Sequence, residues 1–271
     1  MQTTGGILKV EIVLPKHELI QFSMVKLRMQ KFQNDSSPTY NGELFLNNIE
    51  VSLIGYNSFI ANKFMKAFKT YSDSDERNVL DFGAGIGTLS EIFAARYQYD
   101  VTCVELDIKL RNILLNKGFS AFSQLREVKL NFNKVFTSNV LEHIENDVEV
   151  LTEIGYKMDS GGVLCIFVPA FQILYSDFDA SIGHVRRYTK KELQNKLQIA
   201  EFQILSTNYV DSLGFIITFL LKKLKLIALV TKSTKTISLY DKLGFPISRV
   251  LDNIGLRFLF GKNIFIVARR K

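Results

Sequence analysis

The feature that most constrains this fold is an apolar segment that ends in closely spaced glycines. Asn78–Phe82 is followed by Gly83, Gly85 and Gly87, and a helical pattern then covers Thr88–Tyr97. Glycine allows a tight backbone bend and lets a ligand approach the main chain where a β-carbon would collide. A strand, a glycine turn and a helix in this order predict a nucleotide-type ligand site in an open α/β sheet.

The spacing of the glycines narrows the choice of ligand. Asp81 and the glycines form Asp-x-Gly-x-Gly-x-Gly, whereas a dinucleotide site has Gly-x-Gly-x-x-Gly and holds a pyrophosphate at the helix start. The early third glycine and the acidic residue favour a ligand with a cationic ammonium group. Glu105 ends the next predicted strand, about twenty residues on, where a carboxylate can accept both hydroxyls of a ribose. Asp107 is the alternative carboxylate.

The chain beyond this turn alternates β-rich runs with helical patterns, as a parallel sheet with crossover helices requires. The predicted strands are 78–82, 101–105, 120–122, 135–139, 163–168, 202–206 and 264–268. The predicted helices are 56–70, 88–97, 108–116, 147–158 and 190–200. Thr189, followed three residues later by Glu192, has the capping-box pattern that marks the start of the last of these helices.

The stretch from Asn78 to Val168 resembles the class I S-adenosylmethionine-dependent methyltransferases. Residues 81–87 are similar to their first motif, and Glu105 stands at the place of their ribose-binding acid. The resemblance implies a Rossmann-like α/β fold with a seven-stranded, mostly parallel sheet, an antiparallel last strand and helices on both faces. It also implies a methyltransferase domain over 49–271, with a helical insertion or lid at 211–260 between strands six and seven. Residues 1–48, where 7–13 alternate like a strand, would be an N-terminal appendage.

The same resemblance implies S-adenosylmethionine as cofactor and S-adenosylhomocysteine as its product. Asp81 and the glycine turn would hold the methionine end, and Glu105 the ribose. The family often has an acidic residue beside the adenine, but here Ser123 and Gln124 stand in that region and would supply the contact. The predicted cofactor-binding residues are Asp81, Gly83, Ala84, Gly85, Gly87, Glu105, Leu106, Ser123, Gln124 and Asn139.

Two further motifs predict the acceptor side, because ligands of an open parallel sheet gather at the carboxyl ends of its strands. Leu-Glu-His at 141–143 looks like a segment of small-molecule methyltransferases, the ubiquinone O-methyltransferase type among them. Gly-His-Val-Arg-Arg-Tyr at 183–188 resembles a subgroup associated with bacterial surface-polysaccharide and glycolipid pathways. The candidate catalytic residues are Glu142, His143, Asp179 and His184, and the candidate acceptor-binding residues are Tyr175, Arg186, Arg187 and Tyr188.

Each of these motifs also has a structural interpretation. His143 could cap a helix or form a hydrogen bond in the core instead of accepting a proton. Arg186 and Arg187 could bind a phosphate or carboxylate and Tyr188 could stack on a sugar, or the whole string could form a salt-bridged lid over the cofactor. The three histidines lie far apart in the sequence, and the two cysteines are too widely separated to form a metal-binding Cys-x-x-Cys motif, so we predict no metal site.

The sequence therefore predicts a methyltransferase that acts on a hydroxyl of a sugar-containing or other small-molecule acceptor. The alternatives are an acceptor in a membrane lipid or quinone, and a non-catalytic module that only binds S-adenosylmethionine. The net charge of +7 suits an anionic partner. A nucleic-acid partner is not favoured, because basic residues are not interleaved with aromatic ones in a strand platform.

A strongly apolar stretch at 213–230 is interrupted by three lysines after nine residues, whereas a membrane-spanning helix needs about twenty apolar residues. An amphipathic helix here could lie in a membrane interface, pack on the domain or form a homodimer interface. The first residues show neither a basic start with an apolar core nor a cleavage site. We therefore expect a cytoplasmic protein, with peripheral membrane contact through 213–230 as the alternative.

Overall fold

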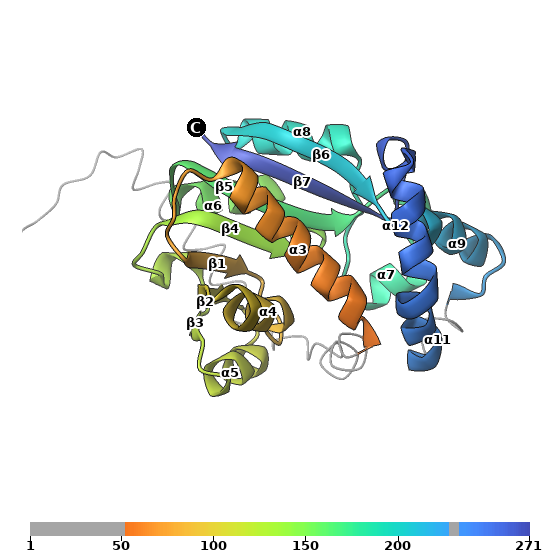
Figure 1. Ribbon diagram of the computed structural model, residues 1–271, viewed down its shortest axis with the longest axis horizontal. Coiled ribbons are helices and arrows are strands. Elements are labelled where there is room, and N and C mark those ends of the chain that lie inside the picture. The colour runs from red at the N-terminus through yellow and green to blue at the C-terminus, as the bar shows by residue number, and fades with distance from the viewer. Residues whose placement is uncertain (1–51, 228–232) are drawn as a thin grey trace, which may run out of the picture. The chain divides into compact units, whose positions relative to one another are not determined.

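The computed structural model describes residues 52–227 and 233–271 (Figure 1). All of the described residues belong to one compact unit, Asn41–Lys271. The strand predicted at 7–13 and the predicted appendage at 1–48 lie outside the described residues.

Within the described residues, seven strands form one sheet in the order β3-β2-β1-β4-β5-β7-β6. The strands are β1 Asn78–Phe82, β2 Asp100–Val104, β3 Ser120–Phe122, β4 Phe132–Ser138, β5 Met158–Pro169, β6 Phe202–Val210 and β7 Asn263–Arg270. β7 runs antiparallel to β5 and β6, and the other neighbouring strands are parallel. This confirms the predicted fold class, and it places the carboxyl ends of β1, β2, β4 and β5 along one edge of the sheet.

Helices cover both faces of the sheet. The α-helices are α3 Ile54–Tyr71, α4 Thr88–Tyr97, α5 Ile108–Asn116, α6 Asp147–Tyr156, α7 Asp177–Ser181, α8 Lys190–Ile199, α9 Ser212–Lys223, α11 Thr234–Leu239 and α12 Phe245–Asn253. Short helical turns are η1 Leu125–Glu127, η2 Leu141–His143, η3 Gln172–Leu174, η4 Tyr240–Gly244 and η5 Leu256–Phe258. Buried side chains of α3, α4 and α5 share one core with the sheet, while those of α6 and α8 share the other (Figure 1).

The apolar stripe predicted for the first helix packs α3 against the sheet. Ile60, Phe64 and Phe68 are at most 2% exposed, and the ring centroid of Phe64 lies 5.3 Å from that of Phe136 in β4. Burying each such side chain stabilises the fold by about 1.5–3 kcal/mol. This helix therefore contributes a large part of the core that supports β1 and β4.

β5 and β6 extend furthest beyond their predicted bounds. β6 continues to Val210 because its backbone pairs with β7 as far as Asn263, although Ser206, Thr207 and Asn208 interrupt the apolar pattern. β5 begins earlier than predicted and ends at Pro169, the last residue paired with β7. Backbone pairing, which depends on the neighbouring strand, sets these bounds.

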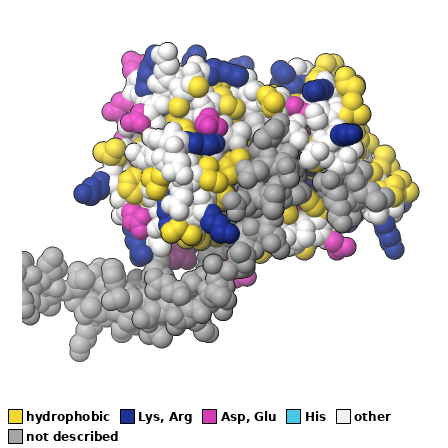
Figure 2. Space-filling view, turned by 90° about the horizontal axis from the view of Figure 1, so that it is seen from below, with side chains coloured by type: hydrophobic (Ala, Val, Ile, Leu, Met, Phe, Trp, Pro, Cys, Tyr) yellow, Lys and Arg dark blue, Asp and Glu magenta, His cyan; other side chains and the backbone are white. Residues whose placement is uncertain are grey.

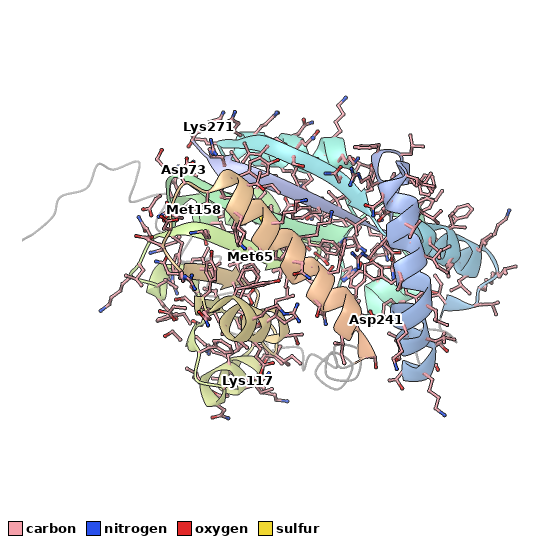
Figure 3. The ribbon with its side chains drawn as sticks, viewed as in Figure 1. Met65, Asp73, Lys117, Met158, Asp241 and Lys271 are labelled. Carbon is pink, nitrogen blue, oxygen red and sulfur yellow. The ribbon has the colours of Figure 1, made fainter. Side chains whose placement is uncertain are left out.

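Helices α9, α11 and α12 lie between β6 and β7. Asp241 accepts hydrogen bonds from the backbone nitrogens of Gly55 and Tyr56, at 2.8 and 2.7 Å, and so caps the start of α3 (Figure 3). Asp252 in α12 accepts a hydrogen bond from the backbone nitrogen of Asp211, which follows β6, at 2.9 Å. Buried carboxylates thus attach these helices to the sheet domain. No helix in the described ranges is both long and apolar enough to cross a membrane.

Candidate active site

The turn after β1 contains three glycines at positions where the backbone disfavours any side chain. Gly83, Gly85 and Gly87 have φ angles of 78°, 57° and 86°, in the left-handed region that favours glycine. The backbone nitrogen of Gly83 donates to the carbonyl oxygen of Val104 at the end of β2, at 2.8 Å. A β-carbon on Gly83 would lie 2.2 Å from Cγ2 of Val140, so the segment after β4 closes directly over the turn.

Asp81 places a carboxylate beside this turn. The residue lies in β1 and is 3% exposed, and the hydroxyl of Ser90 in α4 donates to its Oδ2 at 2.6 Å. A buried carboxylate at the strand end suits the ammonium group of a methionine moiety. Ser90 was not predicted from the sequence, because a serine in the first turn of a helix is common without any ligand nearby.

Glu105 connects the ends of β1 and β2. Its Oε2 accepts a hydrogen bond from the backbone nitrogen of Gly85 at 2.8 Å, and its Oε1 accepts one from that of Asp107 at 2.9 Å. Burial raises the pKa of Glu105, and these hydrogen bonds oppose the rise. Asp107, the alternative ribose carboxylate, caps α5 by accepting from the backbone nitrogen of Lys109 at 2.7 Å. The arrangement therefore favours Glu105 as the ribose-binding residue.

The segment after β3 contains a carboxylate that the sequence did not predict there. Glu127 in η1 accepts hydrogen bonds from the backbone nitrogen and the hydroxyl of Ser123, at 2.9 and 2.7 Å. The helical turn η1 brings Glu127 back to the end of β3. The sequence did not predict this position because the helical turn was not predicted. Gln124 is half-buried beside it, and Leu106 after β2 is 75% exposed.

These residues fit S-adenosylmethionine. The buried Asp81 suits the ammonium group, Glu105 suits the ribose, and the glycines let the backbone bend tightly between them. Asn139, at the end of β4, is exposed and has a φ of 54°, which is uncommon outside glycine. Strained backbone at a ligand-binding edge is typical of functional sites.

A group of ionisable side chains lies beyond the end of β4. Glu142 is fully buried, and neither of its carboxylate oxygens meets a hydrogen-bond donor within 52–227 or 233–271. The rings of His143 and His184 meet edge to face with centroids 4.6 Å apart. Nε2 of His184 lies 3.8 Å from Oε1 of Glu142. All three residues were predicted from the sequence as candidate catalytic residues, and the fold brings them together by laying 183–188 against η2.

Burial shifts the protonation of two members of this cluster. It raises the pKa of Glu142 to about 8. Burial also lowers the pKa of His143 to about 4, and the nearby His184 adds to that effect. Asp179 behaves differently, because hydrogen bonding to His184 and the charge of Arg187 outweigh its burial and hold its pKa at about 2.

Asp179 acts as an anchor in this structure, which corrects its predicted role as a base. Its Oδ1 lies 3.0 Å from Nδ1 of His184 and accepts from Nε of Arg187 at 2.8 Å. Its Oδ2 accepts from the hydroxyl of Ser176 at 2.9 Å. A carboxylate with this many donors orients its neighbours and is a weak proton acceptor.

The predicted acceptor-binding arginines are already paired. Arg187 is 7% exposed, and its NH2 atom lies 2.7 Å from Oδ1 of Asp179. Arg186 donates to Oδ2 of Asp147 at 2.9 Å. The two guanidinium groups that were expected to bind a phosphate or carboxylate of the acceptor thus bind carboxylates of this chain. This agrees with the salt-bridged alternative. The hydroxyl of Tyr175 donates to the carbonyl oxygen of His184 at 2.6 Å and holds the same segment.

Tyr188 is fully buried, so the prediction that it stacks on an acceptor is wrong. Its hydroxyl lies 2.9 Å from the carbonyl oxygen of Leu141 and 2.8 Å from Oδ2 of Asp147. Asp147 is 2% exposed and also binds Lys196 at 2.8 Å. This aspartate joins α6 to α8 and to the segment 186–188, and its place at the start of a predicted helix did not reveal that role.

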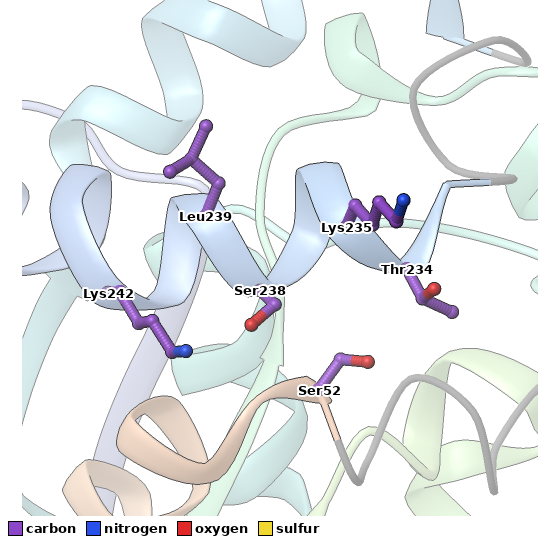
Figure 4. A pocket seen from close by; sticks show the side chains of 6 residues that line it. All are labelled: Ser52, Thr234, Lys235, Ser238, Leu239 and Lys242. Atoms are coloured by element: carbon purple, nitrogen blue, oxygen red, sulfur yellow. The ribbon is translucent and has the colours of Figure 1, made fainter.

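A separate surface pocket lies at α11 (Figure 4). It is lined by Ser52, Thr234, Lys235, Ser238, Leu239 and Lys242. None of the predicted site residues is among these lining residues.

Several solved structures are similar to this chain in fold. An S-adenosylmethionine-dependent methyltransferase from Archaeoglobus fulgidus has a TM-score of 0.51 at 15% identity, with 79% of this chain and 94% of that chain covered. A candidate sarcosine dimethylglycine methyltransferase from Galdieria sulphuraria has a TM-score of 0.51 at 13% identity, covering 80% and 84%. An S-adenosylmethionine-dependent methyltransferase from Thermotoga maritima has a TM-score of 0.51 at 15% identity, covering 85% and 98%.

The family itself is shown by the sequence. No curated protein sequence matches the chain significantly. A family model described as a methyltransferase domain matches residues 56–207, more than half of the chain, and this range includes β1 to β5 and the glycine turn. The chain therefore belongs to the methyltransferase-domain family and is a class I S-adenosylmethionine-dependent methyltransferase.

Proposed function

We propose that this enzyme transfers the methyl group of S-adenosylmethionine to a hydroxyl of a sugar-containing or other small-molecule acceptor. The observation that carries the proposal is that backbone hydrogen bonds fix the segment 170–188, which follows β5, against the residues that follow β4. The nitrogen of Val185 donates to the carbonyl oxygen of Glu142 at 2.8 Å, and that of Phe171 donates to the carbonyl oxygen of Tyr188 at 2.8 Å. Glu142, two residues after the Val140 that packs on the glycine turn, is thereby joined to the segment that follows β5.

Methyl transfer from a sulfonium needs no covalent intermediate with the protein. When bound, S-adenosylmethionine supplies a methyl group already activated on a sulfonium. The acceptor oxygen forms a bond to the methyl carbon as the carbon–sulfur bond breaks, and the proton of the hydroxyl passes to a base or to water. The residues of this chain therefore contribute mainly by aligning the acceptor and excluding water. His143 and His184 are the candidates for receiving the proton.

The motif at 183–188 supports a sugar-containing acceptor, through its resemblance to the subgroup associated with polysaccharide and glycolipid pathways. Because Arg187 and Tyr188 point into the protein, the motif would support acceptor binding indirectly, by positioning His184. Acceptor contacts would then come from exposed or half-buried groups at the same edge, such as Asn139 and His143.

The test is incorporation of labelled methyl from S-adenosylmethionine into separated polar-glycan, small-metabolite, lipid, RNA and protein fractions. We expect label in the glycan or small-metabolite fraction, abolished by Asp81→Asn and retained by the exposed control Asp73→Asn. Label confined to RNA or protein would contradict the proposal. Cofactor binding in calorimetry without label in any fraction would instead indicate a non-catalytic binding module.

A second candidate, an acceptor in a membrane lipid or quinone, is favoured by an apolar surface on α9 and α12. Figure 2 shows hydrophobic side chains gathered at the end of the molecule that these helices form. The exposed apolar residues there are Ile216, Leu220, Leu224, Ile247, Val250 and Ile254. Phe215 is half-buried, and its ring centroid lies 5.2 Å from that of Phe171.

Sedimentation with anionic vesicles tests this second candidate. We expect the protein to pellet with vesicles, and Leu220→Glu to release it. Leu115→Glu is the matched control, because Leu115 is an equally exposed leucine on a helix elsewhere, at 50% exposure. If neither variant changes the pelleted fraction, or if Leu220→Glu instead converts a dimer to a monomer in light scattering, the surface is not a membrane contact.

A further inference from the structure

The ionisable group formed by Glu142, His143 and His184 has the composition of a metal site. One ligand atom from each of these residues lies within 4.8 Å of the other two. Two imidazoles and one carboxylate are a common set for zinc and related first-row dications, whereas magnesium and calcium prefer oxygen ligands. We infer that Glu142, His143 and His184 bind one divalent transition-metal ion at the end of β4.

The state of Glu142 is the strongest observation. The side chain is fully buried, yet no other described residue donates a hydrogen bond to either of its oxygens. A buried carboxylate without partners is strongly destabilising, so it requires a proton or a cation. The distance of 3.8 Å from Oε1 to Nε2 of His184 is too long for a hydrogen bond. Ligands placed about 2.1 Å from a tetrahedral ion lie roughly 3.4 Å apart, close to this spacing.

Each histidine is oriented by a second partner, as metal-binding histidines usually are. Oδ1 of Asp179 faces Nδ1 of His184 at 3.0 Å. A proton held on Nδ1 leaves the lone pair of Nε2 directed to the side of Glu142. His143 forms a backbone hydrogen bond with Gly183. A carboxylate or backbone carbonyl that binds the other ring nitrogen fixes both the tautomer and the direction of a ligand.

The surrounding backbone holds the two halves of the site together. The backbone nitrogen of Val185 donates to the carbonyl oxygen of Glu142 at 2.8 Å. This hydrogen bond joins the segment that carries Glu142 and His143 to the segment that carries His184. The side chain of His184 is 10% exposed, and His143 is half-buried. The cluster is thus largely dry but open on the side of His143.

Three protein ligands leave at least one coordination position free, as in catalytic zinc sites. Resting on the proposed function, we assign that position to the acceptor hydroxyl. An oxygen bound to the ion would lose its proton to solvent more readily, so that solvent takes the place of His143 and His184 as the proton acceptor. The alkoxide oxygen would then bond to the methyl carbon as the carbon–sulfur bond of the cofactor breaks and S-adenosylhomocysteine leaves. This assignment narrows the substrate class to acceptors whose hydroxyl can bind a dication.

The experiment uses the full chain after chelation and dialysis, titrated calorimetrically with Zn²⁺, with Co²⁺ absorption as a spectroscopic signature. We expect one ion per chain, a rise in Tm on metal addition, and a Zn²⁺ affinity at least about a hundredfold lower in Glu142→Gln. His184→Gln provides a second variant, and Glu149→Gln, an exposed carboxylate on α6, is the matched control. Unchanged metal affinity in both variants, or no uptake by the wild type, would overturn the site.

Cofactor binding measured on the same samples separates this inference from the proposed function. Retained S-adenosylmethionine binding by Glu142→Gln shows that this variant is folded, so that its lost metal affinity reflects the site itself. Zn²⁺ binding that depends on Glu142 without methyl transfer to any fraction would support the metal site and contradict the proposed function. Labelled transfer that is equal with and without Zn²⁺ would overturn the assignment of the free position to the acceptor.

Discussion

Gly83 and Val140 are so close that a β-carbon on the glycine would lie 2.2 Å from Cγ2 of the valine. The first residue belongs to the turn after β1, and the second follows β4 and directly precedes η2, which contains Glu142. The cofactor turn and the candidate acceptor residues are therefore packed against each other. A change in one is expected to displace the other, because closely packed interiors transmit small volume changes.

Gly83→Ala is expected to destabilise the protein by about 3 kcal/mol or more, since it combines left-handed backbone strain with overpacking against Val140. Gly118→Ala is the matched control, because Gly118 also has a positive φ, of 89°, and a β-carbon there would meet nothing within 4 Å. The control should lose only about 1 kcal/mol. Chemical denaturation gives both values, and equal losses would show that contact with Val140 is unimportant. Calorimetry should also detect at least about a tenfold loss of cofactor affinity in Gly83→Ala alone.

Cofactor binding is expected to weaken in mild acid through Glu105. Burial raises the pKa of this carboxyl, so the folded chain takes up its proton at a higher pH than an unfolded chain would. As the pH rises from the pKa of Glu105 in the unfolded chain to its pKa in the folded chain, ionisation of this carboxyl therefore lowers the free energy of unfolding. For a ligand that requires the carboxylate, affinity falls as the pH drops through the folded pKa, above the usual value for glutamate of about 4.3.

Glu105→Gln provides the control for this pH dependence. It should lower the affinity for S-adenosylmethionine roughly 10–100-fold at neutral pH, because hydrogen bonds to a charged acceptor are the stronger ones. It should also remove the acid-side loss of affinity seen in the wild type. Calorimetric titrations from pH 8 downward, as far as the protein stays folded, measure both effects, and an identical pH profile in the variant would exclude Glu105 as the titrating group.

The sheet could be predicted from the sequence because its signals are local. Each parallel strand is a short apolar run, and the turn at Gly83 marks the first crossover. Strand bounds were less predictable, since the polar residues 206–208 of β6 are held in the sheet by pairing with β7. That pairing joins segments separated by the whole of α9 to α12 and leaves no pattern in either segment.

The candidate site divides in the same way. Local spacing predicted that Asp81 and Glu105 lie at the ends of successive strands, and the structure places the carboxylate of Glu105 on the backbone of the glycine turn; their roles in cofactor binding stay predictions. The partners of Arg187 and Tyr188 could not, because Asp179 and Asp147 are brought to them only by the tertiary fold. Charged and aromatic residues in a loop fit ligand binding and internal salt bridges equally well, and burial decides between the two.

Tyr188→Phe is expected to lower the stability of the protein without affecting the cofactor. The substitution keeps the ring but removes the hydroxyl that lies 2.9 Å from the carbonyl oxygen of Leu141 and 2.8 Å from Asp147. Leaving such buried groups without this partner should cost about 1–3 kcal/mol. Tyr156→Phe is the control, because Tyr156 is 70% exposed. Denaturation and calorimetry check the outcome, and a large loss of cofactor affinity with full stability would contradict this structural role.

Asp241→Ala tests whether the helices between β6 and β7 stabilise the sheet domain. The carboxylate of Asp241 accepts from the first backbone nitrogens of α3, those of Gly55 and Tyr56, and replaces a local helix cap. Its removal should lower the unfolding free energy by about 1–2 kcal/mol, the usual effect of losing a cap. Asp241→Asn, which keeps one oxygen acceptor, should lose less.

Hydrogen exchange locates the effect of this substitution. In Asp241→Ala, the amides of the first turn of α3 should exchange faster, while those of β4 change only in proportion to global stability. Asp73→Ala is the matched control, since Asp73 is exposed just after the other end of α3 (Figure 3). Unchanged exchange at Gly55 and Tyr56 would mean that α3 is stable without this cap. Faster exchange there would show that the helices between β6 and β7 hold the start of the helix that supports β1 and β4, and thereby the cofactor turn.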